Sequence, residues 1–288
     1  MINNSIAVIL ITLNEGHNLE RTFANLSGWA DEIFVLDSFS TDDTVDICIK
    51  HNVTIFQHPF IGFGDQWNKA LNCFPISSSW TMKLDPDEEI SDELKSSIKD
   101  SISKKEKDGF YVDRYLYFME KRLPIKQEIL RVWKTGECEF TDSLVNEYPV
   151  VSGNLGKVRG ELKHFDSPNL EHWYNKQNKY STAEAISKIE GNSLALKPSL
   201  FGNEASRRMF FKNIFYLIPF RYLLLYLYHL FFLRAIIAGR VGLIWSKLRC
   251  DVYRQVEYKY LEMKNSNKPY QTLTELKGPP DNRCKQID

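Results

Sequence analysis

The stretch "SIAVILITL" (Ser5–Leu13) decides the fold class of this chain. It is nearly all apolar and rich in β-branched residues, which is typical of a strand buried on both faces, as in a parallel sheet. The next stretch, "NEGHNLERTFANLSGW", carries Leu19, Phe23 and Leu26 at helical spacing. A buried strand that runs straight into an amphipathic helix predicts an α/β domain.

The same alternation continues along the first third of the chain. Further strands are expected at "DEIFVLDS", "VTIFQHPF" and "SWTMKLD". Between them, "STDDTVDICIKHN" predicts a helix with Ser40 or Thr41 as its N-cap, and "GFGDQWNKALNCF" predicts a turn that enters another helix. Strands and helices that alternate across short turns predict a doubly wound, mostly parallel sheet flanked by helices.

The middle of the chain is less regular. "DGFYVDRYLYF" alternates and predicts a strand, whereas "EILRVWKTGECEF" predicts a hairpin. A helical pattern returns from about Leu170 to Gly191.

Composition places the chain among ordinary globular proteins. Of its 288 residues, 43% are hydrophobic and 26% are charged, and the formal net charge of zero gives no reason to expect nucleic acid as a partner. The five cysteines are scattered without CxxC spacing, which indicates reduced thiols rather than a disulfide framework or a zinc site. Reduced thiols indicate a cytoplasmic location, and the first residues lack the basic segment that a signal peptide would have.

Polar side chains follow the ends of three predicted strands. They are Thr12 and Asn14, then Asp37 and Ser38, then Asp85 and Asp87. Because parallel sheets bind ligands beyond the carboxyl ends of their strands, these residues are expected to line a site. Asp85 and Asp87 could hold Mg²⁺ or Mn²⁺, which prefer oxygen ligands. The alternative is that "DPDEEISDEL" is a turn followed by the acidic first turn of a helix.

The segment "NIFYLIPFRYLLLYLYHLFFLRAIIAGRVGLIWSKL" (213–248) is unusually apolar. Its length would allow a membrane span, but Pro219, Arg221 and His229 oppose one. Its tyrosines and its fringe of arginines and lysines favour apolar, amphipathic helices that lie in or dip into the interface of an anionic membrane. A buried helical hairpin and a dimer contact are the alternatives, so a homo-oligomer through these helices stays open.

Several stretches together resemble the family 2 inverting glycosyltransferases, which have the GT-A fold. They are "VILITLNEGHNLERTF", "WADEIFVLDSFSTDDTVDI", "GFGDQWNKAL", "LDPDE", "FTDSLVNE", "LKHF" and "PFRYLLLYLYHLFFLRAIIAGRVGLIW". The later stretches are similar to the bacterial branch that builds lipopolysaccharide core and related envelope glycans. The resemblance covers most of residues 5–250.

The resemblance implies a role for each matching residue. Donor-binding roles fall on Thr12, Asn14 and Glu15 at the nucleotide, Asp37 and Ser38 at the base and ribose, and Asp85 at the ribose and metal; apart from the resemblance, Arg131 could reach the diphosphate. Asp87, with Asp85, matches the DxD motif that holds Mg²⁺ or Mn²⁺, and His164 matches a histidine that could touch the metal. Glu147 matches the catalytic acid on the acceptor side. It would take the proton of the acceptor hydroxyl in a single displacement.

Structural alternatives remain for several of these residues. Asp37 could brace a turn, Glu147 could be a surface acid, His164 could be structural, and Arg131 could form a salt bridge within a hairpin. Glu88 is a secondary candidate for the metal.

The chain departs from the family pattern at some positions. Asn146 stands where the branch usually has histidine, Trp67 stands where it often has lysine or arginine, and Pro86 replaces a small residue inside the DxD. These changes leave open a non-catalytic scaffold. A sugar nucleotidyltransferase is disfavoured, because "TLNEGHN" is acidic and has one glycine where that class needs a glycine-rich basic loop.

The expected organisation has three parts. Residues 1–200 form the catalytic domain, with a donor half over about 1–105 and an acceptor half over about 106–200. A membrane-interface segment covers 201–262, and 263–288 is a flexible tail. The expected partners are a nucleoside-diphosphate sugar, a glycan or lipid-linked acceptor, and the inner face of the cell membrane.

Overall fold

The structure is a computed structural model that describes residues 4–141, 147–189, 214–215 and 218–266. These residues fall into two compact units. Residues 4–116 and 126–165 make the first unit, and residues 117–125 and 166–266 make the second. The predicted boundary at residue 200 and most of the predicted tail lie outside the described residues.

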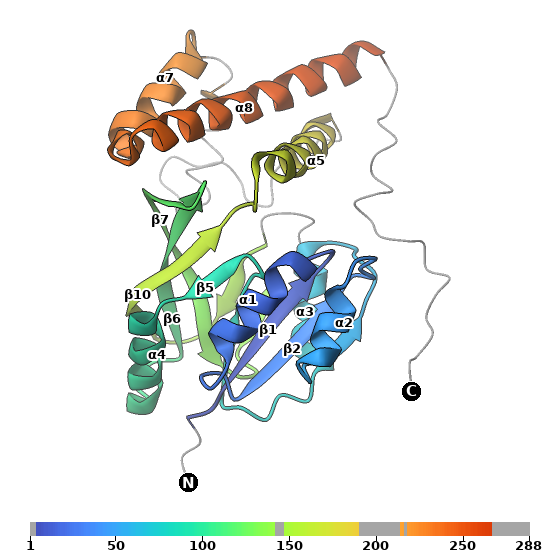
Figure 1. Cartoon of the computed structure of the whole chain (residues 1–288), viewed down its shortest axis with the longest axis vertical. Helices are drawn as coiled ribbons and strands as arrows, with labels where there is room; N and C mark the ends of the chain where they lie inside the picture. The colour runs from blue at the N-terminus through green and yellow to red at the C-terminus, as the bar shows by residue number, and fades with distance from the viewer. Residues whose placement is uncertain (1–3, 142–146, 190–213, 216–217, 267–288) are drawn as a thin grey trace. The chain divides into compact units, whose positions relative to one another are not determined.

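One eight-stranded sheet organises the first unit (Figure 1). Its strand order is β3 (Thr54–Gln57), β2 (Glu32–Asp37), β1 (Ile6–Thr12), β4 (Trp80–Lys83), β7 (Lys121–Lys134), β6 (Gly109–Phe118), β10 (Leu155–Phe165), β5 (Glu88–Ile90). Strands β3, β2, β1 and β4 are parallel neighbours, whereas β4 pairs antiparallel with β7 and β10 pairs antiparallel with β5. The four parallel strands are the four that the sequence predicts.

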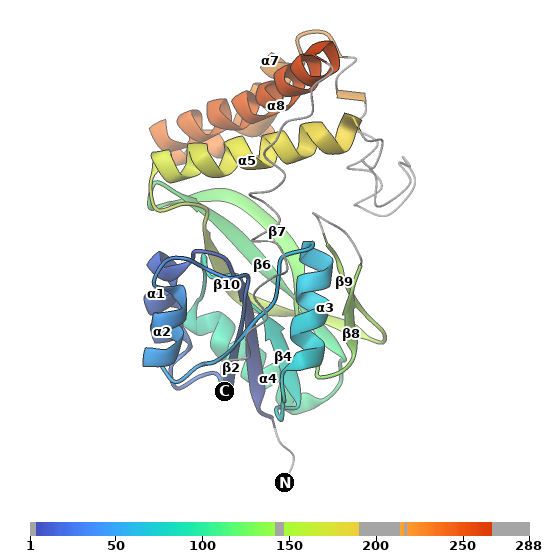
Figure 2. The same cartoon turned by 90° about the vertical axis from the view of Figure 1, so that its right-hand side faces the viewer.

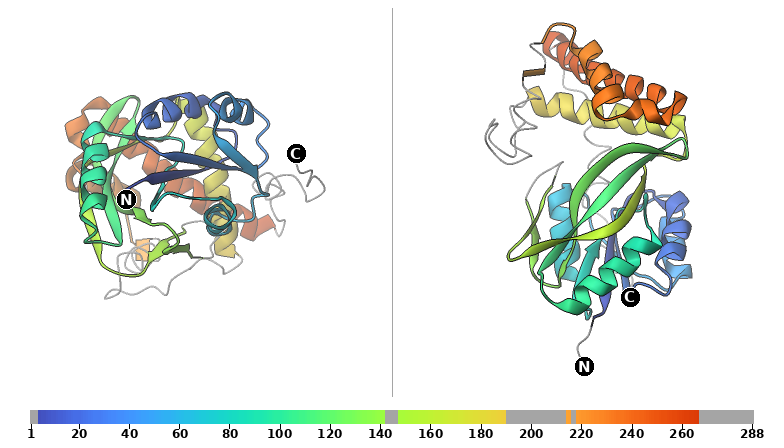
Figure 3. Two further views of the ribbon diagram at one scale, coloured as in Figure 1. Left: turned by 90° about the horizontal axis from the view of Figure 1, so that it is seen from below. Right: turned by 90° about the vertical axis from the view of Figure 1, so that its left-hand side faces the viewer.

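Helices cover both faces of the parallel strands, as Figure 2 and the left view of Figure 3 show. They are α1 (Gly16–Leu26) and α2 (Thr44–Lys50) on one face and α3 (Phe63–Cys73) on the other, whereas α4 (Asp92–Lys104) packs against β10 and shares a core cluster with α1 and α2. Strand β1 divides its side chains between them: Ile6, Val8 and Leu10 belong to one core cluster, and Ala7 and Ile9 to the other. Strand β1 is therefore buried on both faces, as its continuous apolar sequence predicts.

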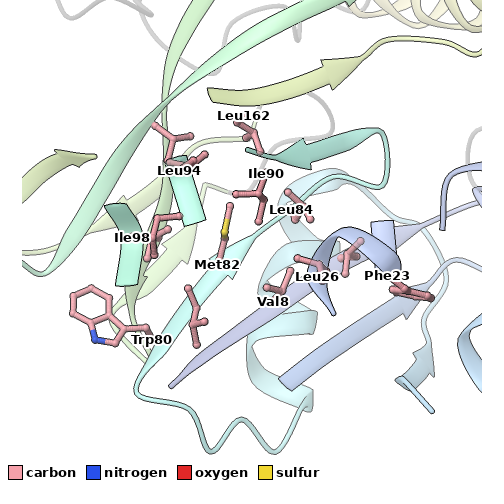
Figure 4. Close-up of a cluster of buried hydrophobic side chains, with 14 of the residues drawn as sticks. Val8, Phe23, Leu26, Trp80, Met82, Leu84, Ile90, Leu94, Ile98 and Leu162 are labelled. Carbon is pink, nitrogen blue, oxygen red and sulfur yellow. The ribbon is translucent and has the colours of Figure 1, made fainter. Parts of the chain in front are cut away.

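The larger of the two clusters lies between the sheet and the helices α1, α2 and α4 (Figure 4). Val8 and Met82 reach it from neighbouring strands, and Leu26, Leu94 and Ile98 reach it from α1 and α4. Each fully buried aliphatic side chain contributes about 1.5–3 kcal/mol relative to exposure. This packing fixes the strand ends that carry the polar residues.

Two local predictions are wrong, and one alternative holds only in part. Helix α2 begins at Thr44 with Asp43 as its N-cap, because the Ser40 hydroxyl and amide are bound to Asp37 instead. The alternative for "DPDEEISDEL" holds in part: α4 begins after the N-cap Ser91 with Asp92 and Glu93 in its first turn, but Glu88 lies before it in β5, which pairs with β10. The hairpin does not form, because β8 (Cys138–Phe140) pairs with β9 (Pro149–Val151) in a separate small sheet.

The second unit is mainly helical. It contains α5 (Leu170–Ile189), α7 (Arg221–Leu227), the π-helix η1 (Tyr228–Phe232), the 3₁₀ helix η2 (Ala235–Ala238) and α8 (Arg240–Ser266). Helix α8 packs against the other four. Among the described residues, no helix has the length and apolarity needed to cross a membrane.

Close packing fixes the turn from η2 into α8. A Cβ at Gly242 would lie 1.8 Å from the carbonyl oxygen of Ala235, so only glycine allows this approach. In the second half of α8, the carboxylate of Glu257 binds both Arg221 and Tyr222 of α7.

Candidate active site

The strand order places a candidate site beside β1. The chain runs from β1 outward to β2 and β3, then returns to β4 on the other side of β1. Ligands of open α/β sheets bind at such a reversal, beyond the carboxyl ends of the strands. Thr12, Asp37 and Asp85 lie at or just beyond these ends, on one edge of the sheet.

Asp37 ties three strand ends together. Its carboxylate is fully buried and accepts hydrogen bonds from the Thr12 hydroxyl at 2.9 Å, the Ser40 amide at 2.8 Å and the Gln57 side chain at 2.9 Å. Ser38 is also buried, and its amide donates to the Thr12 carbonyl at 2.8 Å. These two residues form a rigid floor at the ends of β1 and β2.

Asn14 and Glu15 hold the two adjacent loops against each other. Asn14 has a positive φ of 57°. Its amide donates to the Ser40 hydroxyl, and its side-chain oxygen accepts from the Thr41 amide, both at 2.8 Å. The Glu15 amide donates to the Thr44 hydroxyl at 2.9 Å. The loop after β1 is therefore locked onto the loop after β2.

A cluster of carboxylates and cations lies at the end of β4. The Arg131 guanidinium donates to Asp85 at 2.7 Å and to Glu88 at 2.5 Å, and Arg114 donates to Glu88 at 3.2 Å. Burial alone would raise the pKa of Asp85, but the charges of Arg131, Lys83 and Arg114 hold that pKa well below its usual range. Asp85 is therefore ionised at neutral pH.

Arg131, on β7, forms salt bridges with the carboxylates of this cluster, so the salt bridge that the sequence left open is present but its partners come from the segment after β4. Arg131 is nearly completely buried, and its Nε has no hydrogen-bond partner within the described part of the chain. Burial would lower its pKa, but Asp85 and Glu88 raise that pKa above its ordinary value. The guanidinium is thus a permanent cation between two carboxylates.

Asp87 and His164 lie together, although they are far apart in the sequence. His164 Nε2 is 3.3 Å from Asp87 Oδ2, and the Asp87 carbonyl accepts from the Phe165 amide at 2.8 Å. The pairing of β5 with β10 produces this meeting, because His164 stands opposite Glu88 in the register. A carboxylate oxygen and an imidazole nitrogen are both ligands that Mn²⁺ accepts.

The donor set fits an ion that is shared with a substrate. Within the described ranges, no three or more His, Cys, Asp or Glu side chains group into a metal site. Mg²⁺ and similar ions usually take only one or two carboxylates and complete their shell with water and substrate phosphates. Asp87 with His164 satisfies that lower requirement, whereas the Asp85 carboxylate is paired with Arg131.

Glu147 joins the cluster through Lys83. The Lys83 ammonium lies 2.8 Å from Glu147 Oε1 and 4.0 Å from Asp85 Oδ1. Glu147 is therefore not a freely exposed surface acid: its side chain is only 14% exposed. Its predicted neighbour in the motif, Asn146, lies outside the described residues.

Two cations of this cluster are absent from the sequence prediction. Lys83 is the last residue of the buried strand β4, and Arg114 comes from β6. A lysine in a buried, mostly apolar strand is itself a signal that could have identified Lys83. Arg114 carries no such signal, because it lies in an alternating, partly exposed strand.

Comparison with known proteins gives a consistent family. Residues 7–161 match the model described as glycosyl transferase family 2. An uncharacterised glycosyltransferase of Rickettsia conorii is 31% identical over 205 residues, which cover 64% of this chain and 70% of that protein. One from Rickettsia prowazekii is 26% identical over 201 residues, and the match spans 62% of this chain and 66% of that relative. The lipopolysaccharide core biosynthesis glycosyltransferase LpsC of Rhizobium meliloti is 27% identical over 197 residues, which cover 64% of this chain and 72% of that protein.

A solved structure supports the fold. S. aureus TarS (residues 1–349) in complex with UDP-GlcNAc aligns with a TM-score of 0.50 and 15% identity over 93% of both chains. At this identity the likeness concerns the fold alone. The predicted α/β sheet of GT-A type with flanking helices is confirmed.

Proposed function

The chain belongs to glycosyl transferase family 2, and we propose that it transfers a sugar from a nucleoside-diphosphate sugar to a bacterial envelope glycan or glycolipid. The observation that carries this proposal is a pair of contacts beyond the carboxyl end of β4: Lys83 lies between Asp85 and Glu147, and Asp87, two residues after Asp85, lies beside His164. The similarity to LpsC supports an envelope glycan as the acceptor. TarS, which shares the fold, was crystallised with UDP-GlcNAc, so UDP-sugars are the first donors to test.

The nucleoside would bind over the ends of β1 and β2. Asp37 and Ser38 form the floor there, and Thr12 braces it. Asn14 and Glu15 lie in the loop above, with their backbone already fixed by hydrogen bonds. A rigid site of this kind lowers the entropy cost of binding, because little needs to be ordered when the nucleotide arrives.

The charge balance of the site argues for a divalent cation. Arg131, Arg114 and Lys83 are already matched by the carboxylates of Asp85, Glu88 and Glu147. An incoming diphosphate therefore meets no excess of positive charge from these six groups. Asp87 and His164, with Asp85, would hold Mg²⁺ or Mn²⁺ beside it. When bound, the ion supplies positive charge for the departing diphosphate.

Glu147 is the proposed base. Its carboxylate accepts the proton of the acceptor hydroxyl as that oxygen forms its bond to C1 of the sugar. The bond between C1 and the phosphate oxygen breaks in the same step, and the nucleoside diphosphate leaves with the electron pair. One displacement from the opposite face inverts C1, so no covalent glycosyl-enzyme is formed.

The second unit supplies a proposed membrane contact. Its exposed apolar side chains include Phe220, Phe231, Phe232, Ile236 and Ile237, of which the three phenylalanines are between 63% and 80% exposed. Arg234 and Arg240 are exposed in the same stretch of sequence. Exposed aromatic and aliphatic side chains beside arginines favour the interface of an anionic membrane. We therefore place the protein on the inner face of the cell membrane, where a lipid-linked acceptor is available.

A thermal-shift screen tests the donor side of the proposal. Purified protein is incubated with UDP, UDP-glucose and UDP-GlcNAc, each with Mn²⁺ or with EDTA. Because a bound ligand stabilises the folded state by about 2.7 kcal/mol at 100 times its Kd, a donor raises the melting temperature only when Mn²⁺ is present. Asp87→Asn removes one ligand charge and is expected to abolish that dependence. A shift of equal size with EDTA would contradict the metal role.

Glu147→Gln tests the acceptor side. This variant should bind UDP with Mn²⁺ as the wild type does, yet lose turnover of the UDP-sugar by about 10²–10⁴-fold, the usual contribution of a general base. Retained turnover would remove Glu147 from the mechanism. Release of pyrophosphate from a nucleoside triphosphate and a sugar phosphate would point to a nucleotidyltransferase instead.

A further inference from the structure

Lys83 is a charged residue in a place built for apolar ones. It is the last residue of β4, paired in register with Ile9 of β1, and its side chain is only 8% exposed. Burying an ammonium is costly unless the charge is paired, so this position calls for a specific partner. None of the roles implied by the family resemblance uses it.

Two aromatic rings confine the ammonium. Lys83 Nζ lies 4.3 Å from the centroid of the Trp67 ring and 5.3 Å from that of Phe140. These rings are themselves buried and stack on each other at 5.6 Å. Asn68 exchanges two hydrogen bonds with the Phe140 backbone, at 2.7 and 2.8 Å, so helix α3 and strand β8 hold the rings in place. A cation over an aromatic face gains about 0.5–2 kcal/mol.

The carboxylates of two different segments meet this confined charge. Glu147 is 2.8 Å away and Asp85 is 4.0 Å away. Glu147 precedes β9, which belongs to the separate two-stranded sheet, whereas Asp85 follows β4 of the main sheet. The ammonium therefore links the acceptor-side carboxylate to the donor-side one.

We propose that Lys83 is a positioning residue: its ammonium holds the Glu147 carboxylate at a fixed position relative to Asp85 of the DxD motif. This inference rests on the proposed glycosyl transfer, because it gives the ion pair a task in that reaction. Because Trp67 and Phe140 confine the Lys83 ammonium, its charge stays in one position instead of moving toward other anions. The competing role, direct binding of the donor diphosphate by Lys83, predicts a different kinetic result.

Lys83→Met separates the two roles. Methionine keeps the unbranched, apolar stem and removes the charge. Loss of positioning should lower kcat for UDP-sugar turnover by about 100-fold, the cost of a misplacement of about 1 Å, while the Kd for UDP with Mn²⁺ changes less than about tenfold. Lys50→Met is the matched control, because Lys50 forms a 2.6 Å pair with Glu20 that is largely exposed. It should change neither quantity.

A double-mutant cycle identifies the partner. If Lys83 acts through Glu147, then Lys83→Met should reduce turnover little further in a Glu147→Gln background. Effects that multiply would show that the two residues act independently, and would overturn the proposal. So would a Lys83→Met variant with normal kcat, or one whose loss lies in affinity for UDP.

Hydrogen exchange provides a readout that needs no substrate. The peptide that carries Glu147 and Tyr148 should take up deuterium faster in Lys83→Met than in the wild type. Unchanged uptake would contradict the proposal that Lys83 holds Glu147 in place. Wild type that binds no UDP would refute the proposed function instead, so the two failures are distinct. If Lys83→Met does not fold, Trp67→Leu removes one of the two aromatic rings that confine the ammonium, and it should lower kcat without loss of UDP affinity. Unchanged kcat would refute the role of these rings.

Discussion

Replacing Arg131 with methionine should destabilise the protein more than any surface change. The guanidinium binds Asp85 at 2.7 Å and Glu88 at 2.5 Å, and the Glu88 side chain has no exposed surface. Removing one partner of a buried ion pair leaves an uncompensated charge and costs about 3–5 kcal/mol. For a chain of this size, a loss of that magnitude lowers the melting temperature by roughly 6–20 °C.

The pH dependence of that loss has a definite sign. In the wild type the pKa of Asp85 is lowered, so its contribution to stability is present above the ordinary pKa of aspartate and disappears as the pH falls toward the folded-state value. Without Arg131 that contribution shrinks. The difference in stability between wild type and Arg131→Met should therefore be largest at neutral pH and decrease below about pH 4.

The assay is urea denaturation followed by tryptophan fluorescence at pH 7 and at about pH 3, because the difference should decrease only below the ordinary pKa of aspartate. Lys126→Met is the matched control on the same strand, because the Lys126 side chain is half exposed and its pair with Asp113 should contribute no more than about 1 kcal/mol. In the double variant with Glu88→Met, an apolar contact replaces one buried charge, so part of the loss should return. A loss below about 1 kcal/mol in Arg131→Met, or a double variant weaker than the single, would refute the reasoning.

Three further predictions concern other parts of the chain. Gly160→Ala places a Cβ 2.3 Å from a backbone nitrogen at a φ of +104°, so its urea midpoint should fall well below that of Gly136→Ala, where φ is +86° and the space is open; equal midpoints would contradict the packing. Phe232→Glu should weaken binding to phosphatidylglycerol vesicles, measured by sedimentation, by more than about tenfold, whereas Tyr258→Glu on the exposed surface of α8 should not. If Phe232→Glu changes the oligomeric state instead, the exposed apolar residues around Phe232 belong to a dimer contact. Cys48 is buried with its pKa raised to about 12, so native protein should leave it unlabelled by a thiol reagent at pH 8, as mass spectrometry of the peptides would show.

The parallel half of the fold could be predicted from the sequence because its signals are local. The run Ser5–Leu13 is apolar on both faces, and β1 is indeed buried on both. The polar residues that end β1, β2 and β4 were placed on one edge by the rule for parallel strands alone. The helical periodicity from Leu170 likewise matches α5.

The antiparallel half could not be predicted in the same way, because its pairing is set by distant segments. Nothing within "EILRVWKTGECEF" tells that Cys138 to Phe140 pair with β9 instead of folding back on β7. Glu88 has the sequence surroundings of a helix start, yet its strand partner lies more than seventy residues later, in β10. The Lys83–Glu147 pair was missed for the same reason, since 64 residues separate its members.

The short strand β5 has a consequence for how this protein can vary. Only three residues, Glu88 to Ile90, pair with β10, in the order Leu162 opposite Ile90, Lys163 opposite Glu89 and His164 opposite Glu88. Neighbouring residues of a strand point to opposite faces, so sliding β10 by a single position would offer a lysine or a phenylalanine to Asp87 in place of the imidazole. An inserted or deleted residue in the turn before β10 would therefore replace the imidazole beside Asp87 with a different side chain. Length changes should be rarer in that turn than in the exposed connections on the opposite edge of the sheet.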